Sequence, residues 1–256
     1  MAGPIVTHQT TSYLTAPDGI RLAIHEMGEG RPLLLLHGYF SDAATNWIKY
    51  GHAALLAAAG HRVIMADLRA HGESDKPHDP AAYPKDILAD DGLAIVDQLG
   101  LSDYDLGGYS LGGRTVARML AKGATPRRVI IAGMGLEGLA TTGLRAAHFR
   151  AIFDGLGNHP KGSPAWMAEA FLKTTGGDPV ALALILDTFV DTPIEVINGW
   201  RMPVQVLTGS DDHDNGSGPN LADMLADPTL SVVPGNHMSA VTKPDLGRAM
   251  VDFLTA

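Results

Sequence analysis

The segment Gly108–Gly112, which reads GYSLG, constrains this chain more than any other feature. The apolar stretch before it, Asp103–Gly108, predicts a strand, and Leu111–Lys122 after it predicts a helix. A serine between glycines at such a junction indicates a nucleophile elbow, a strained turn that exposes the serine hydroxyl. Side chains two positions from the serine would collide with it, which explains the glycines. Because the chain has 30 glycines, the alternative is a glycine-rich turn with a capping serine.

Short apolar runs alternate with helical patterns along most of the chain, which predicts an α/β fold. Continuous apolar runs favour strands buried on both faces, and Pro17-Asp18-Gly19 predicts a turn between two antiparallel strands. We expect a mostly parallel, doubly wound sheet of about eight strands. The predicted strands are Ser12–Ala16, Ile20–Met27, Pro32–Leu36, Arg62–Leu68, Asp103–Gly108, Val129–Ala132, Val204–Leu207 and Leu230–Val233. The other predicted helices are Trp47–Ala59, Asp86–Leu99, Leu221–Leu225 and Leu246–Leu254.

One long segment interrupts this alternation. Residues 135–200 carry helical but no strand signals, and the strand pattern returns only after Pro203. We therefore expect residues 1–134 and 201–256 to form one core. Residues 135–200 are predicted to be a helical insertion between the sixth and seventh strands.

Composition excludes several classes of function. The chain has 28 acidic and 19 basic residues, a formal charge of -9, which disfavours binding to nucleic acid. It has no cysteine, so disulfides, thiolate metal sites and cysteine nucleophiles are excluded. The first residues lack the pattern of a signal peptide, and no apolar run approaches the roughly 18 residues of a membrane span. We expect a cytoplasmic protein that does not bind membranes. The sequence carries no indication of the oligomeric state.

A serine hydroxyl needs a base to accept its proton, and elbow proteins order their residues serine, acid, histidine. His237 follows the last predicted strand, so it is expected on a loop at the carboxyl edge of the sheet. The earlier His37 is expected to have a structural role, because it precedes a glycine at the end of a strand.

The acid should follow the strand Val204–Leu207, where Asp211, Asp212 and Asp214 compete. Spacing alone does not choose among them. The same cluster, with its histidine, could ligate a metal ion. No ordered ligand pattern occurs elsewhere, so we expect neither a metal nor an organic cofactor.

Acyl transfer also needs two backbone N–H groups aimed at the developing oxyanion. One is expected from Leu111, directly after the serine. The loop after Pro32–Leu36 should supply the other, with Tyr39 the first choice and Phe40 the second.

Together these blocks resemble the α/β-hydrolase superfamily, and within it the small esterases and lactonases with short caps. The resemblance rests on HGYF (37–40), DLRAHGES (67–74), GGYSLGG (107–113), TGSDD (208–212) and PGNH (234–237). In that family the acid most often lies three residues after the glycine that ends the seventh strand, which implies Asp212. Glu137 would be the acid if it followed the sixth strand instead. Ser110 disfavours the branches with an aspartate nucleophile, such as haloalkane dehalogenases and epoxide hydrolases.

The resemblance also implies that residues 135–200 form a cap over an apolar acyl pocket. The pocket residues expected from it are Phe40, Met134, Leu136, Trp166 and Met238, with Phe149, Phe153, Phe171 and Leu186 as further candidates.

The function implied is a serine esterase. Ser110, His237 and Asp212 would cleave small-molecule esters with small to medium apolar acyl groups, through an acyl-enzyme. The same triad could serve a C–C bond hydrolase, a lactonase, a hydroxynitrile lyase or a cofactor-free dioxygenase. C–C bond hydrolases usually need a group that binds a carboxylate. Arg114 and Arg118 are expected in or behind the helix, where they would form no such clamp. A protein that only binds its ligand is the remaining alternative.

Overall fold

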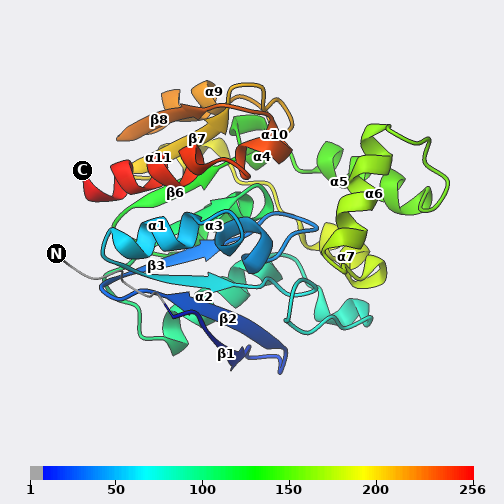
Figure 1. Ribbon diagram of the computed structural model, residues 1–256, viewed down its shortest axis with the longest axis horizontal. Helices are drawn as coiled ribbons and strands as arrows, with labels where there is room; N and C mark the ends of the chain where they lie inside the picture. The colour runs from blue at the N-terminus through cyan, green and yellow to red at the C-terminus, as the bar shows by residue number, and fades with distance from the viewer. Residues whose placement is uncertain (1–7) are drawn as a thin grey trace.

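A single eight-stranded sheet organises the computed structural model, which describes residues 8–256 (Figure 1). The strands lie in the order β1-β2-β4-β3-β5-β6-β7-β8. β3 to β8 are parallel, whereas β2 pairs antiparallel with both β1 and β4. This confirms the predicted α/β class. The strands are β1 Thr10–Thr15, β2 Arg21–Met27, β3 Arg31–Leu36, β4 His61–Ala66, β5 Asp105–Tyr109, β6 Val129–Ala132, β7 Val204–Gly209 and β8 Pro228–Val233.

Helices cover both faces of the sheet, which is why the central strands are apolar throughout. In β3, Leu33 and Leu35 pack with α1 and α11, while Leu34 and Leu36 pack with α2, α3 and α9 on the opposite face. All four leucines are fully buried. The helices of the core are α1 His52–Ala58, α2 Ile87–Gln98, α3 Leu111–Ala121, α9 Gly218–Asp223, α10 His237–Ala240 and α11 Pro244–Thr255.

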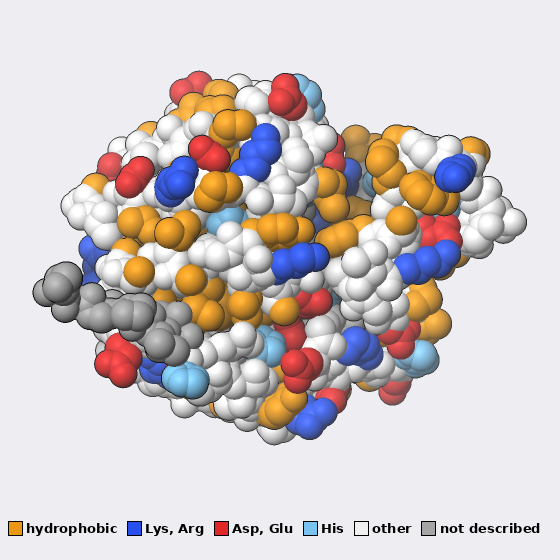
Figure 2. Space-filling view, in the orientation of Figure 1, with side chains coloured by type: hydrophobic (Ala, Val, Ile, Leu, Met, Phe, Trp, Pro, Cys, Tyr) orange, Lys and Arg blue, Asp and Glu red, His pale blue; other side chains and the backbone are white. Residues whose placement is uncertain are grey.

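Five helices and one 3₁₀ turn lie between β6 and β7, and we call them the inserted helices. Figure 1 shows α5, α6 and α7 as a lobe on one side of the core, and Figure 2 shows hydrophobic side chains where the lobe meets the core. Of the inserted helices, α4 instead packs against α3 and α9 of the core. The Ser163 and Asp178 side chains cap two of them, each followed by a proline. The inserted helices are α4 Leu136–Ala140, α5 Gly143–Asp154, α6 Pro164–Thr174, α7 Pro179–Ile185 and α8 Ile194–Asn198, with the 3₁₀ turn Leu186–Thr188.

One predicted helix is wrong. Trp47–Ala59 is not continuous, because Gly51 adopts a left-handed conformation with φ 81°. A π-helical turn, Ala44–Ile48, precedes Gly51, and α1 begins only at His52. The other predicted elements differ from the observed ones by a few residues at their ends. In residues 8–256, no helix combines the length and apolarity that crossing a membrane requires.

Candidate active site

Ser110 occupies a strained turn between β5 and α3, with φ 54° and ψ −112°. Two glycines make that turn possible. A Cβ on Gly108 would lie 2.2 Å from the carbonyl carbon of Gly112, and a Cβ on Gly112 would lie 2.0 Å from the oxygen of Leu36. The expected elbow geometry is therefore present. Its glycines avoid neighbouring backbone, however, rather than the serine side chain that the sequence suggested.

His237 lies within reach of Ser110. Its Nε2 is 3.0 Å from Ser110 Oγ, and its Nδ1 is 2.8 Å from Asp212 Oδ2. If Nδ1–H donates to the carboxylate, Nε2 is left to accept the serine proton. The predicted loop position was wrong: His237 is the first residue of the short helix α10, and Asn236 caps it with a capping box.

Asp212 is the carboxylate that the structure brings to His237. Burial opposes ionisation here, but the hydrogen bond from His237 and that residue's charge hold the pKa of Asp212 below its usual value. The backbone N–H of Asp214 also donates to Asp212 Oδ1, at 3.1 Å. Asp211 is exposed and accepts from Ser210 Oγ instead. Glu137 accepts from the N–H of Ser217, so it is bound elsewhere.

The loop after β3 lies beside Ser110. A Cβ on Gly38 would come within 3.5 Å of the Ser110 Cβ, and the Gly38 N–H donates to Asn46 Oδ1 at 3.0 Å. Within residues 8–256, neither the N–H of Tyr39 nor that of Leu111 donates a hydrogen bond. Both are therefore available to a ligand next to Ser110. Asn46, which fixes this loop, carries no sequence signal that would have identified it.

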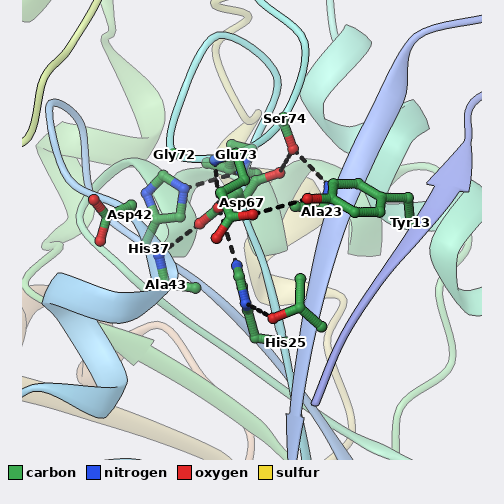
Figure 3. A network of polar contacts seen from close by, with 12 residues as sticks. Tyr13, Ala23, His25, His37, Asp42, Ala43, Asp67, Gly72, Glu73 and Ser74 are labelled. Carbon is green, nitrogen blue, oxygen red and sulfur yellow. Dashed lines mark hydrogen bonds and ion pairs between the residues drawn. The ribbon is translucent and has the colours of Figure 1, made fainter. Parts of the chain in front are cut away.

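A buried polar network holds the same loop from below (Figure 3). Asp67 accepts from the N–H groups of Ala43 and Glu73, each at 2.8 Å, and lies 3.1 Å from His25 Nε2. The pKa of Asp67 is far below its usual value, because these hydrogen bonds outweigh its burial. His37 Nε2 accepts from the N–H of Leu68 and its Nδ1 lies 2.8 Å from Gly38 O, while burial lowers its pKa. His37 therefore fits the structural role expected of it.

Residues 31–130 match a family model described as the alpha/beta hydrolase fold. An esterase from Exiguobacterium antarcticum superposes with a TM-score of 0.79 at 18% identity, over 96% of this chain and all of that one. The chain has the α/β-hydrolase fold. The resemblance noted in the sequence is therefore confirmed.

Curated relatives match the chain over shorter stretches. The AB hydrolase superfamily protein YisY of Bacillus subtilis is 32% identical over 110 residues, 43% of this chain and 39% of its own length. A 2-hydroxymuconate semialdehyde hydrolase of Pseudomonas sp. is 32% identical over 130 residues, 50% of this chain and 45% of its own. Others are named epoxide hydrolases. The chain spans less than half the length of these relatives.

Two cavities meet at Ser110. The larger, about 390 Å³, lies between the core and the inserted helices. The smaller, about 250 Å³, extends toward Thr45, Tyr50 and Thr242. Tyr39, Ser110, Phe171, His237 and Met238 line both. A substrate with a group on each side of the reacting carbon could occupy both at once.

The predicted pocket residues fall into two sets. Phe40 and Met238 line the larger cavity, and Met134 lines a small void beneath Ser110. Leu136 and Trp166 line none of these three spaces. The reason for Trp166 is helical phase: the face of α6 toward the larger cavity carries Pro164, Met167, Ala168 and Phe171.

Two basic side chains at this site were missed. Arg145 and His148 on α5 line the larger cavity, as does Asp214. Arg114, expected in or behind its helix, lines the small void together with Ser110. Among the described residues, no three histidine, aspartate or glutamate side chains converge in a way that could hold a metal ion.

Proposed function

We propose that this chain is a serine hydrolase of carboxylic esters that works through an acyl-enzyme. The observation that carries the proposal is the continuous contact from Ser110 Oγ through His237 to Asp212, at 3.0 and 2.8 Å. A nucleophile, a base and a carboxylate that orients the base are the groups that acyl transfer to serine requires. Ser110 also disfavours the epoxide hydrolase chemistry named for some relatives, because that branch uses an aspartate nucleophile.

In the first half of the reaction, Ser110 Oγ attacks the ester carbonyl carbon while His237 Nε2 takes the hydroxyl proton. The carbonyl oxygen becomes an oxyanion, which accepts hydrogen bonds from the N–H groups of Leu111 and Tyr39. The bond to the leaving oxygen then breaks, and His237 returns the proton to the alcohol. In the second half, water attacks the acyl carbon while His237 takes a proton from it. The bond to Ser110 Oγ then breaks, His237 returns the proton to Ser110, and the acid is released.

The walls of the two cavities support a substrate with small to medium acyl and alcohol groups. Phe40, Phe149 and Met167 make much of the larger cavity apolar. The second candidate is hydrolysis of a C–C bond by the same triad, which the semialdehyde hydrolase relative and the arginines near Ser110 favour. The choice between them is a choice of substrate, since both begin at Ser110.

Hydrolysis of a chain-length series of p-nitrophenyl esters tests the proposal. We expect turnover by the wild type and loss of at least about a thousandfold in Ser110→Ala. Ser102→Ala, an exposed serine outside the cavities, is the matched control and should behave as wild type.

Labelling with a fluorophosphonate separates the remaining outcomes. Labelling of Ser110 without ester turnover would overturn the ester assignment and favour C–C hydrolysis. If a folded protein neither turns over nor is labelled, the proposal of serine catalysis is wrong.

A further inference from the structure

Arg114 is a buried charge that no carboxylate of residues 8–256 pairs with. It lies one helical turn after Ser110, and only 4% of its surface is exposed. Its Nε and Nη2 atoms both donate to one oxygen, Gly138 O, at 3.3 and 3.1 Å. The face of the Phe189 ring lies 4.4 Å from the guanidinium. A guanidinium has five N–H donors, so most of the hydrogen-bond donors of Arg114 have no acceptor within residues 8–256.

Burying a charge without a counter-ion is costly, so such a group calls for an explanation. Burial, together with the charge of the nearby Arg145, lowers the pKa of Arg114 to about 10. The side chain is nevertheless cationic at neutral pH. The two nearby carboxylates have other partners: Asp86 pairs with Arg118. Asp191, whose charge acts to raise the pKa of Arg114, accepts from Thr142.

Arg145 brings a second guanidinium to the same place from the inserted helices. It makes one ion pair, at 3.3 Å, with Asp214, and lies 4.8 Å over the Phe149 ring. Its side chain is 20% exposed, and it lines the 390 Å³ cavity. His148 lines that cavity too, but burial and the charge of Arg145 lower its pKa, which keeps it neutral at pH 7.

The two arginines line one small void. It measures about 10 Å³, room for one water-sized group such as a single oxygen atom. Asp214 is the only acidic residue that lines either the void or the 390 Å³ cavity, within residues 8–256. The pair of spaces therefore carries an excess of one positive charge in a protein of net charge -9. The residues common to both spaces are Tyr39, Ser110, Arg145 and Phe149.

We propose that Arg114 and Arg145 form an anion subsite, and that the substrate is an ester whose acyl part carries a second, ionised carboxylate. This inference rests on the proposed ester hydrolysis and names its substrate class. A carboxylate oxygen placed between the two guanidiniums would use the free donors of Arg114 and supply the missing negative charge. The apolar walls of the larger cavity would contact the methylenes between the two carbonyl groups.

A matched pair of substrates tests this inference. In the mono-p-nitrophenyl ester of adipic acid the acyl chain ends in a carboxylate; in p-nitrophenyl 6-methylheptanoate an isopropyl group of similar shape replaces it. We expect kcat/KM of the wild type to be about tenfold or more higher for the anionic ester, as one charge-assisted hydrogen bond would give. Equal rates, or a preference for the neutral ester, would overturn the subsite.

Arg114→Gln and Arg145→Gln should each lower the ratio of the two kcat/KM values by about tenfold. The control is Arg150→Gln, on the same helix, α5, as Arg145. Arg150 pairs with Asp187 at 2.6 Å and lines neither space. Its ratio should equal that of the wild type. Because Arg114 is buried, Arg145→Gln keeps the test valid if Arg114→Gln fails to fold. Equal losses on both esters would contradict the proposal and assign the arginines to stability or to the oxyanion.

Binding measured without turnover separates this inference from the proposed function. Calorimetry on Ser110→Ala with dicarboxylates from succinate to pimelate should show binding that weakens about tenfold in Arg145→Gln and as salt rises. Such binding in a protein that cleaves no ester would support the anion subsite and contradict the proposed ester hydrolysis. Ester cleavage that needs Ser110, without dicarboxylate binding at any length, would do the reverse.

Discussion

The hydroxyl of Tyr109 donates a hydrogen bond of 2.6 Å to the backbone oxygen of His237. The residue that precedes the candidate nucleophile therefore holds the candidate base. Tyr109 is almost fully buried, and its ring lies 5.3 Å from the imidazole of His237. One side chain of the elbow thus positions α10, although Ser110 and His237 lie 127 positions apart in the sequence.

Tyr109→Phe removes this hydrogen bond and keeps the ring. We expect kcat for a p-nitrophenyl ester to fall about three- to tenfold. A lost neutral hydrogen bond costs about 1 kcal/mol, and here that bond fixes the backbone that carries the base His237. Tyr83→Phe is the control. It removes a similar bond of 2.7 Å, to Pro77 O, away from both cavities, and should change stability but not kcat. Equal kcat in the two variants would contradict a positioning role for Tyr109.

Replacement of the two adjacent aspartates by asparagine distinguishes the triad acid. Asp212→Asn should lower kcat by about 10⁴, since asparagine would favour the wrong tautomer of His237. Asp211→Asn should stay within about twofold of the wild type, because Asp211 is exposed and contacts Ser210 rather than His237. Steady-state kinetics at one pH suffices. A collapse in Asp211→Asn would show that the loop after β7 rearranges in solution.

Much of this fold follows from the sequence for identifiable reasons. The central strands are continuous apolar runs, so the hydrophobic pattern was enough to predict the sheet. Gly108 and Gly112 flank a serine at a strand end, and this spacing was enough to predict the elbow. The candidate acid could not be chosen from the sequence. Three aspartates follow β7, and only the contact of Asp212 with His237 separates them.

The errors share a physical cause: they depend on contacts between distant segments. Gly51 ends a helical pattern that propensity alone would continue. Trp166 does not line the larger cavity, because the face of α6 toward that cavity carries Pro164, Met167, Ala168 and Phe171. Arg114 and Arg145 come from different helices, 31 positions apart, and no local pattern shows that they line one void.

The tight approach between α3 and β3 predicts a strong effect of one methyl group. A Cβ on Gly112 would lie 2.0 Å from Leu36 O, so Gly112→Ala must shift the elbow or the strand. We expect it to lower the free energy of unfolding by about 3 kcal/mol or more, measured by urea denaturation. Gly143→Ala is the control, since its Cβ would meet no atom within 4 Å. It should be neutral or stabilising by up to about 1 kcal/mol.

The buried pair of His25 and Asp67 predicts a window of pH in which it stabilises the fold (Figure 3). The pair lies at 3.1 Å, and its side chains are 4% and 2% exposed. The hydrogen bond to Asp67 raises the pKa of His25, against the effect of burial. Because its pKa is raised by folding, protonated His25 stabilises the fold fully below the unfolded pKa of about 6.5. This contribution is lost as pH rises through the pKa of the folded state. The pKa of Asp67 is lowered by folding, so its effect has the opposite sign. Ionised Asp67 stabilises the fold above its unfolded pKa of about 3.9, and this contribution is lost progressively as pH falls below that value.

The two effects overlap between about pH 4 and 6.5. There we expect His25→Gln to be less stable than the wild type by about 1.5–3 kcal/mol, the usual worth of a hydrogen bond to a charged group. The difference should shrink as pH rises above 7 and His25 loses its proton. Urea denaturation at several pH values measures it, with the exposed His8→Gln as control. A difference that is constant from pH 5 to 9 would mean that His25 stays neutral, and that its bond to Asp67 stabilises the fold without a change of charge.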